Sequence, residues 1–491
     1  MIHFNNSVIT KKALVLATLL IAIQINGESV RNTKAQPNII LINIDDMGYG
    51  DTEPYGSTGF ATPNFNKLAK EGMRFTHFYA AQAVCSPSRA ALLTGCYPNR
   101  LGLAGALMPW SPKALSTSEE TIASLLKKSG YSTGMLGKWH LGSKPPFLPL
   151  HFGFDSFYGI PYSHDMWPMD YNGNQITDTA NWRIRYPPLP VLEGDQQVAT
   201  ISSLEQQATL TGTLTEKAVE FIFKNKNHPF FLYFAHPMPH VPLAVSKKFR
   251  GKTTEGLFGD VISELDWSIG KVMEVLDQVG LANNTILIVT SDNGPWLSFG
   301  NHAGSSGGLR EGKGTAWDGG TRIPCFIRWP GKVAAGSICS QLLTNMDILP
   351  TIVAAAKASM PKQKIDGLDF LPLLTGKANN TPREVFYVYY DTNSLKLIRY
   401  KQWELVLPHT SQAYTQGSTG KDGKPGPTPV VPVPTALYNL THDPGTVFDV
   451  QKQYPGIVAQ LLQYAEAARE DLGDDLTNRK GKNIRAAGIA R

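Results

Sequence analysis

Two pairs of oxygen-bearing side chains follow apolar runs in this sequence. Asp45 and Asp46 come after residues 37–44, and Asp292 and Asn293 come after residues 285–291. Carboxylate and amide oxygens are the ligands that Ca²⁺ and Mg²⁺ prefer, whereas zinc sites favour Cys and His. Adjacent carboxylates also repel each other, and a bound cation relieves that repulsion. The pattern predicts a Ca²⁺ or Mg²⁺ site, and the alternative is a pair of solvated turns.

Two histidines follow a third apolar run. Residues 230–235 lead into His236, and His240 stands four residues later. In open α/β sheets, ligands bind beyond the carboxyl ends of the strands. Three parallel strands would therefore bring acids, an amide and imidazoles to one edge. A single such turn could equally be a helix N-cap, but three together predict a functional site.

The segment Cys85–Gly95 is the most specific in the chain. Pro87 suits the first turn of a helix and Gly95 suits the position just past its end, so a short helix led by Cys85 is predicted. A helix N-terminus favours negative charge, which places Cys85 or a derivative of it where anions bind. Arg89 lies one turn later and could hold an anion. The alternative is a buried cysteine that only packs.

An α/β domain must position these residues. The apolar runs 39–44, 230–235, 285–290 and 322–329 predict buried strands. Helical patterns alternate with them, two opened by predicted capping boxes (Thr117 with Glu120, and Thr213 with Glu216) and one spanning residues 262–280. This alternation predicts a large, mostly parallel central sheet flanked by helices. We place this α/β domain at residues 37–375.

The remaining residues, 376–491, differ in pattern. Short strand-like runs at 385–390, 396–399 and 403–407 precede a predicted helix from about residue 455 to residue 472. They predict a smaller subdomain with an antiparallel sheet and a helix. The Pro- and Gly-rich residues 417–434 are predicted to form a loop.

Composition limits the classes of function. Lys and Arg number 46 and Asp and Glu 40 in 491 residues, without a long basic block, so no nucleic-acid partner is expected. Hydrophobic residues make up 42% of the chain, which excludes a disordered protein. The four cysteines (Cys85, Cys96, Cys325 and Cys339) contain no C-x-x-C pair, which argues against a zinc ribbon.

The N-terminus resembles a secretory leader. Lys11 and Lys12 precede the apolar residues 13–23, which are few for a membrane span. We expect a signal peptide at residues 1–27, with cleavage between Gly27 and Gln36, and the alternative is an uncleaved anchor. The protein is therefore expected in a secreted, periplasmic or lysosome-like location, without stable membrane insertion after cleavage.

The residues Cys85-Ser86-Pro87-Ser88-Arg89, followed by Leu92-Leu93-Thr94-Gly95, resemble the signature of the type I sulfatases. Further segments resemble that family in the same order, namely residues 45–51, 137–142, 291–294, 312–314 and 319–320. Residues 161–165 and 470–474 are similar to the branch of arylsulfatase A and N-acetylgalactosamine-6-sulfatase. The resemblance implies an alkaline phosphatase-like fold and a secreted enzyme that removes sulfate from a sulfated saccharide.

In that family a maturation enzyme oxidises the signature cysteine to Cα-formylglycine. The resemblance implies that position 85 carries this aldehyde as a gem-diol, with one oxygen attacking sulfur and the other later expelling sulfate. It also implies Ca²⁺ as the cofactor, with Mg²⁺ as a further possibility. The implied metal ligands are Asp45, Asp46, Asp292, Asn293 and the modified Cys85.

The resemblance assigns roles to the other site residues by matching position. Arg89 would hold the formylglycine, and Lys138 and Lys313 would bind sulfate oxygens. His140 would accept a proton when sulfate is expelled, and His240, rather than His236, would protonate the leaving oxygen. Ser163 would contact the diol or the sulfate.

The outer pocket is expected to include residues 166–195 and 296–308. Trp167, Trp296 and Trp317 would either stack on sugar rings or simply pack. His164 and Asp165 would be substrate contacts or hydrogen-bonded loop residues. Two other functions stay open here: a phosphatase or phosphodiesterase of the alkaline phosphatase superfamily, and a non-catalytic binder of sulfated glycans.

Overall fold

The computed structural model describes residues 36–490, which belong to one compact unit. The predicted signal peptide at residues 1–27 lies outside the described residues. None of the helices within residues 36–490 is long and apolar enough to cross a membrane.

A ten-stranded sheet forms the centre of this unit, and its five middle strands are parallel. In spatial order these are β10 (Thr285–Ser291), β1 (Asn38–Ile44), β9 (Phe230–His236), β5 (Ser132–Lys138) and β6 (Ser156–Ile160). Further strands extend both sides, with β11 (Cys325–Arg328), β2 (Met73–Phe75) and β12 (Ser337–Cys339) beyond β10, and β7 (Leu189–Glu193) and β8 (Gln196–Ile201) beyond β6. These outer pairings are antiparallel, except that β12 runs parallel to β2. The predicted large, mostly parallel sheet is confirmed, although β11 is shorter than the run 322–329 and antiparallel to β10.

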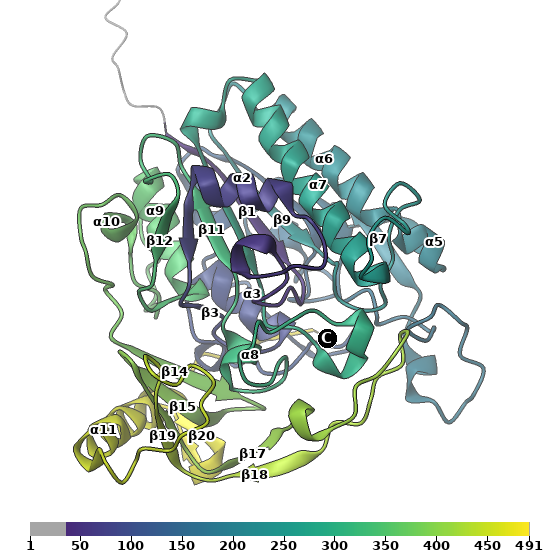
Figure 1. Cartoon of the computed structure of the whole chain (residues 1–491). Coiled ribbons are helices and arrows are strands. Elements are labelled where there is room, and N and C mark those ends of the chain that lie inside the picture. The colour runs from purple at the N-terminus through teal and green to yellow at the C-terminus, as the bar shows by residue number, and fades with distance from the viewer. Residues whose placement is uncertain (1–35, 491) are drawn as a thin grey trace, which may run out of the picture. The chain divides into compact units, whose positions relative to one another are not determined.

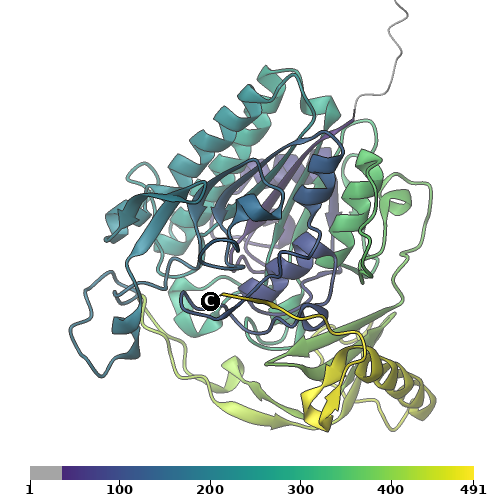
Figure 2. The ribbon, with the colours of Figure 1, turned by 180° about the vertical axis from the view of Figure 1, so that it is seen from behind.

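Helices cover both faces of the sheet. On β1, Ile39 and Leu41 belong to one hydrophobic core, while Ile40 and Ile42 belong to the other. The first core is completed by α3 (Cys85–Thr94), α4 (Ile122–Lys128) and α9 (Ile348–Ala356), and the second by α2 (Pro63–Glu71), α6 (Leu210–Lys224) and α7 (Gly256–Gln278) (Figures 1 and 2). Burial on both faces explains why these strands are continuously apolar.

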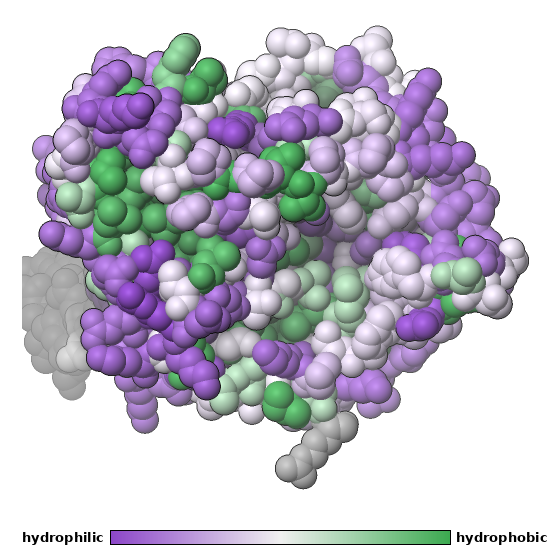
Figure 3. Space-filling model, turned by 90° about the horizontal axis from the view of Figure 1, so that it is seen from below, coloured by the Kyte–Doolittle hydropathy of each residue, from purple (hydrophilic) through white to green (hydrophobic). Residues whose placement is uncertain are grey.

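A four-stranded antiparallel sheet forms most of the C-terminal region, as predicted. It consists of β14 (Val385–Tyr390), β15 (Ser394–Tyr400), β16 (Trp403–Val406) and β19 (Ala436–Asn439), and α11 (Pro455–Leu472) packs against it. Figure 3 views the protein from below and shows hydrophobic patches between hydrophilic residues on that face.

The Pro- and Gly-rich stretch is not wholly a loop. Residues Val430–Val433 form β18, which pairs with β17 (His409–Gln412) in a separate hairpin. The loop between these strands, residues 413–429, contacts the large domain. There the Gly420 and Gly426 amides donate to the Ser298 carbonyl over 3.0 and 2.7 Å. The predicted loop is therefore wrong for residues 430–433.

Both predicted capping boxes are wrong. Helix α4 begins one turn later than expected, and its box joins Thr121 to Ser124 through side-chain bonds of 3.2 and 2.9 Å. Helix α6 begins at Leu210, so Thr213 and Glu216 lie inside it. Leu210 and Thr211 are buried, and their packing extends the helix to the N-terminal side of the cap predicted at Thr213.

The buried His409 on β17 gives the fold a dependence on pH. Its Nδ1–H donates to the Leu407 carbonyl over 2.6 Å. Burial lowers the pKa of His409 from 6.5 to about 4. Between these values the unfolded chain binds a proton that the folded chain does not, so stability is lost as the pH falls.

We therefore expect the midpoint of thermal unfolding to fall between about pH 7 and pH 4.5, and to fall less in a His409→Gln variant. Glutamine keeps a donor for the Leu407 carbonyl but does not titrate. Differential scanning fluorimetry at both pH values measures the change. An equal fall in both proteins would contradict the prediction.

Candidate active site

The predicted site residues meet at the carboxyl edge of the five parallel strands. The backbone ladder continues past the strand ends, because the Asp45 amide donates to the His236 carbonyl over 3.2 Å and the Asp292 amide donates to the Ile44 carbonyl over 3.3 Å. Each of the five middle strands contributes at least one such residue at or just past its end. Asp45 and Asp46 follow β1, and Asp292 and Asn293 follow β10. His240 follows β9, Lys138 and His140 come from the end of β5, and Ser163 follows β6. The sequence predicted three of these strands as contributors, and the structure adds β5 and β6.

Helix α3 and a loop complete the site from above the strand ends. Cys85 is the first residue of α3, and Gly95 ends that helix with a left-handed φ of 69°, as predicted. Arg89 lies on the same helix and is fully buried. Lys313 comes from a loop that is held close by Gly294, where an added Cβ would lie 1.8 Å from the Gly319 carbonyl oxygen. Only glycine therefore permits this approach of the two segments.

Asp46 and His140 adopt a backbone conformation that side-chain-bearing residues seldom take. Their φ values are 61° and 62°, in the left-handed region. Strained residues of this kind persist where the surrounding structure fixes them, and they cluster at functional sites. Both residues stand just past a strand end, where the chain must turn sharply to point a side chain over the sheet edge.

Three buried carboxylates face three buried cations. Arg89 Nε–H donates to Asp292 Oδ2 over 2.9 Å, and Arg89 Nη2 lies 2.8 Å from the same oxygen and 3.4 Å from Asp45 Oδ1. Lys138 Nζ lies 2.5 Å from Asp45 Oδ2, and Lys313 Nζ lies 2.8 Å from both oxygens of Asp46. Charges removed from water in this way are stable only when each one is paired.

The carboxylates of this cluster differ in their preference for a proton. Burial favours the neutral form of Asp45, but the charges of Lys138 and Arg89 outweigh it and lower its pKa well below the usual range. Burial and the charge of Asp45 raise the pKa of Asp292 to about 7. A further cation beside Asp292 would therefore favour its ionised form.

The Cys85 thiol is held in its neutral form. Its Sγ lies 3.4 Å from Asp45 Oδ1 and 3.6 Å from Lys313 Nζ. Burial, followed by the charge of Asp45, raises the pKa of the Cys85 thiol above its ordinary value. Because the thiolate is the nucleophilic form of cysteine, unmodified Cys85 is a poor nucleophile here.

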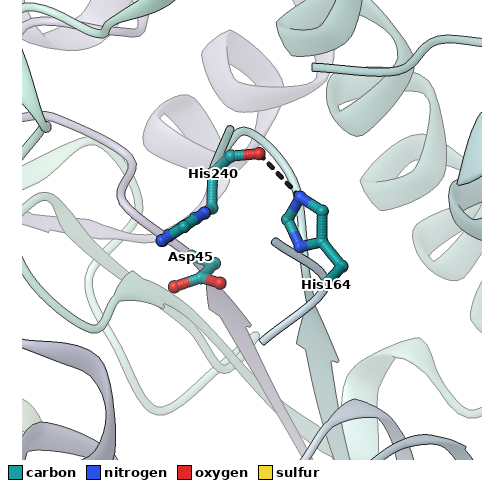
Figure 4. A group of neighbouring side chains, drawn as sticks. All are labelled: Asp45, His164 and His240. Atoms are coloured by element: carbon teal, nitrogen blue, oxygen red, sulfur yellow. Dashed lines mark hydrogen bonds between the residues drawn. The ribbon is translucent and has the colours of Figure 1, made fainter. Parts of the chain in front are cut away.

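Two histidines each have one ring nitrogen available. His140 Nε2–H donates to the Leu107 carbonyl over 2.9 Å, and its buried Nδ1 has no hydrogen-bond partner within residues 36–490. His240 Nδ1–H donates to the Val241 carbonyl over 2.5 Å, which leaves Nε2 on the pocket side, 3.6 Å from Asp46 Oδ2. Figure 4 shows His240 beside Asp45, with His164 Nε2 donating to the His240 carbonyl over 2.9 Å.

His236 lies elsewhere. Its Nε2 lies 3.2 Å from the Ser268 hydroxyl on α7, and its ring packs on Phe234 with centroids 4.0 Å apart. Burial lowers the pKa of His236 to about 3. Of the two histidines, only His240 lines the pocket that contains Cys85.

The oxygen-bearing residues fit a hard cation. Ligand atoms of Asp45, Cys85 and Asp292 all lie within 4.8 Å of one another. Asn293 Nδ2 donates to Asp46 Oδ1 over 2.7 Å, while Asn293 Oδ1 is buried and accepts no hydrogen bond from the described part of the chain. An orphaned amide oxygen beside three carboxylates is the donor set that Ca²⁺ or Mg²⁺ uses.

A pocket of about 230 Å³ opens over Cys85. His140, Ser163, His240 and Lys313 line it close to the cysteine. Its outer wall comes from two distant parts of the chain: Met166, Tyr171, Trp182, Arg183 and Tyr186 before β7, and Tyr390, Gln412 and Tyr414 from the C-terminal region. The C-terminal contributors were not predicted, because nothing local in the sequence links them to Cys85. A larger cavity of about 720 Å³ lies beside the small sheet, and none of the predicted site residues lines it.

The structure decides between stacking and packing for two of the three tryptophans. Trp167 and Trp317 are 0% and 2% exposed, so they pack in the interior and cannot stack on a sugar. Trp317 instead lies under the Arg310 guanidinium, 3.6 Å from its ring centroid. Trp296 does line the pocket, and it is the only residue of the expected stretch 296–308 to do so.

Asp165 offers the pocket an acceptor. Its side chain is 7% exposed, and its Oδ1 has no hydrogen-bond partner among residues 36–490. Burial opposes ionisation, but the charge of His240 and the Ser163 hydroxyl outweigh it and lower the pKa of Asp165 to about 2. The carboxylate is therefore ionised and free to accept a hydrogen bond.

This fold and site define an enzyme that acts on esters of a tetrahedral oxyanion. Two lysines can hold the anion, two histidines can move protons, and an oxygen-lined position beside them can hold a cation. The family model described as Sulfatase matches residues 37–358. The chain belongs to the sulfatase family, and it is an enzyme that hydrolyses sulfate esters. A second model, described as N-sulphoglucosamine sulphohydrolase, C-terminal, matches residues 312–406.

Individual relatives agree with this assignment. Arylsulfatase A of Bos taurus is 37% identical over 453 residues, which cover 87% of this chain and 86% of that protein. N-acetylgalactosamine-6-sulfatase of Mus musculus is 34% identical over 485 residues, covering 92% and 90%. The crystal structure of PsFucS1 sulfatase from Pseudoalteromonas sp. matches with a TM-score of 0.80 and 27% identity over 93% of each chain.

Replacing Arg89 should disable the site because no other side chain can make all its bonds. Besides both aspartates, Arg89 Nη1 donates to the Lys138 carbonyl over 2.7 Å. A lysine cannot form this fork. In an Arg89→Lys variant we expect hydrolysis of 4-nitrophenyl sulfate to fall by about 10²-fold or more, together with a lower unfolding midpoint.

Arg383→Lys is the matched control. Arg383 is also buried and binds both oxygens of Asp347, but it lies outside the pocket. We expect this variant to lose stability while the folded protein keeps its activity. Comparable activity loss in both variants would show that Arg89 acts only through stability.

Proposed function

We propose that this sulfatase removes sulfate from a sulfated saccharide, with formylglycine made from Cys85 as the nucleophile and Ca²⁺ as the cofactor. One observation carries the proposal. Cys85 is a neutral, buried thiol at the first position of a helix, in contact with two oppositely charged members of the cluster, Asp45 and Lys313. A thiol in this state is unreactive, so the surrounding machinery is of use only if position 85 carries a different group.

When formed, formylglycine supplies a hydrated aldehyde whose one oxygen attacks sulfur and whose other oxygen allows sulfate to leave. The remaining work falls to residues of this chain. Arg89 is anchored by Asp292 and Asp45 and would hold the hydroxyl of the diol in position. His140 would accept the departing hydroxyl proton at Nδ1, the ring nitrogen that has no other partner among the described residues.

The sulfate group would lie between the two lysines. Lys138 Nζ is 2.9 Å from Ser163 Oγ, so these two side chains would contact neighbouring sulfate oxygens. Lys313 would bind from the opposite segment, as a point charge on a flexible stem. His240 would act as an imidazolium and donate its Nε2 proton to the leaving alcohol oxygen, while its Nδ1–H stays on the Val241 carbonyl. Burial and the charge of Lys313 lower the pKa of His240, and the carboxylates of Asp46, Asp45 and Asp165 favour its charged form.

Asp45, Asp46, Asp292, Asn293 and the modified residue 85 would hold the cation. Bound there, Ca²⁺ or Mg²⁺ would act as a Lewis acid and neutralise the charge of the sulfate. The balance of charge supports this, because the three carboxylates are already matched by Arg89, Lys138 and Lys313. A divalent cation would thus compensate for the anionic substrate and free the lysines to bind it.

A saccharide suits the rest of the pocket. The Asp165 carboxylate can accept hydrogen bonds from sugar hydroxyls, the Gln412 amide can accept or donate them, and aromatic rings form the walls. The name N-acetylgalactosamine-6-sulfatase describes a relative that acts on a sulfated sugar. We further propose that residues 1–27 direct secretion, that a formylglycine-generating enzyme is a partner, and that residues 37–375 and 376–491 form the catalytic domain and a smaller subdomain.

Mass spectrometry of the tryptic peptide Phe75–Arg89 tests the modification directly. Protein produced together with a formylglycine-generating enzyme should yield this peptide with an aldehyde in place of the Cys85 thiol. Protein produced without that enzyme is the control, and we expect it to retain the thiol and lack activity. An unmodified Cys85 in fully active protein would contradict the proposal.

Two histidine variants test the acid. We expect His240→Gln to lower kcat by roughly 10²–10⁴-fold on a sulfated sugar, whose alcohol needs a proton to leave. The loss should be much smaller on 4-nitrophenyl sulfate, since its leaving group departs without protonation. His236→Gln is the matched control and should leave kcat on both substrates unchanged. Equal losses on the two substrates for His240→Gln would show that it does not act as the acid.

A further inference from the structure

Two half-exposed tryptophans stand at the mouth of the active-site pocket. Trp110 and Trp182 are 51% and 52% exposed, although most large aromatic side chains of the described chain are buried. Both lie against Tyr186, with ring centroids 5.2 and 5.1 Å away. We call these three residues the aromatic rim.

The aromatic rim is continuous with the catalytic pocket. Trp182 and Tyr186 line the same cavity as Cys85 and His240. Met108, which accepts a hydrogen bond from the Tyr186 hydroxyl over 3.7 Å, also lines it. A ligand that fills the pocket and extends outward therefore meets these rings next.

The segments that carry the rim are held in place by hydrogen bonds. Trp182 begins a short 3₁₀ helix, Trp182–Arg185, in which the buried Arg183 donates to the Asp165 carbonyl over 2.5 Å and lies over the Tyr171 and Tyr186 rings. Trp110 lies in a turn closed by the Met108 amide, which donates to Ser111 Oγ over 2.8 Å. The segment between β6 and β7 that contains Trp182 projects beyond the sheet, on the right in Figure 1.

The pocket itself has room for little more than one sugar ring. Its volume of about 230 Å³ is below the roughly 300 Å³ at which pockets for drug-sized ligands begin. A substrate of several rings must therefore extend past the mouth. Exposed aromatic faces at that point are suited to the apolar face of a pyranose ring.

We propose that the aromatic rim is a second sugar-binding subsite, which binds the ring attached to the sulfated one and so selects an oligosaccharide chain as substrate. This inference rests on the proposed function, because it assumes that the pocket receives a sulfated sugar. It adds a binding site at the mouth of the pocket that the sulfate chemistry does not require.

A charged neighbour favours a sulfated chain over a lipid. Side chains three residues apart eclipse each other on a 3₁₀ helix, so Arg185 lies on the same face as Trp182. Arg185 is exposed, and no acidic group of residues 36–490 pairs with it. An anionic substituent on the second ring would meet this guanidinium, whereas an alkyl chain would gain nothing from it.

Binding to a Cys85→Ala protein tests the subsite without turnover. The probes are tetrasaccharides prepared from chondroitin sulfate and from carrageenan, compared with galactose 6-sulfate and N-acetylgalactosamine 6-sulfate as monosaccharides. We expect at least one tetrasaccharide to bind more tightly than the monosaccharides. Trp110→Ala, added to this protein, should weaken the tetrasaccharide by about tenfold and leave the monosaccharides unchanged. Trp182→Ala, whose ring also lines the pocket, should weaken the tetrasaccharide more than the monosaccharides.

Phe223→Ala is the matched control, since Phe223 is 57% exposed on α6 and does not line the pocket. It should change neither affinity. Equal affinities for tetrasaccharides and monosaccharides, or an equal loss for both in the tryptophan variants, would overturn the subsite but not the proposed function. Absence of binding by every sulfated sugar would overturn the proposed substrate class, and with it the subsite.

Discussion

The burial of three carboxylates at one edge of a sheet is the constraint on which this structure depends. Asp45, Asp46 and Asp292 are all nearly inaccessible to water, and their mutual repulsion must be balanced locally. Arg89, Lys138 and Lys313 provide that balance from three different segments. The same pairings draw helix α3, strand β5 and the Lys313 loop toward the strand ends. The electrostatics that make the site reactive therefore also determine how the chain is arranged around it.

The parallel sheet is what makes so dense a cluster attainable. Five neighbouring strands end at one edge, and each contributes a polar side chain within a few residues of its end. The hydrophobic cores on both faces hold those ends in register, since residues such as Ile40 and Leu41 are wholly buried. Left-handed conformations at Asp46 and His140 then turn two of the side chains over the edge. Rigid elements thus position the site, and the loops mainly shape the outer pocket.

Sequence patterns were sufficient for features that depend on neighbouring residues. The continuously apolar strands, helix α3 led by Cys85, and the final helix Pro455–Leu472 all follow from local periodicity and end signals. Patterns failed where long-range packing decides the outcome. Helix α6 starts before its apparent cap because Leu210 is buried, and residues 430–433 pair with β17 despite Pro432. Likewise, no pattern separates the buried Trp167 from the exposed Trp182, because exposure depends on the whole fold.

The origin of the pocket wall has a consequence for the order of events during synthesis. Cys85 is 2% exposed in the folded chain. Tyr390, Gln412 and Tyr414, which line its pocket, are made about 300 residues later. At roughly 5–20 residues per second, a ribosome needs about 15–60 s to cover that distance. If Cys85 is modified as proposed, the modifying enzyme would have a window of this order, in which the cysteine has emerged but its pocket cannot yet be complete. The position of Tyr414, the last residue of the pocket wall in the chain, would set the length of that window.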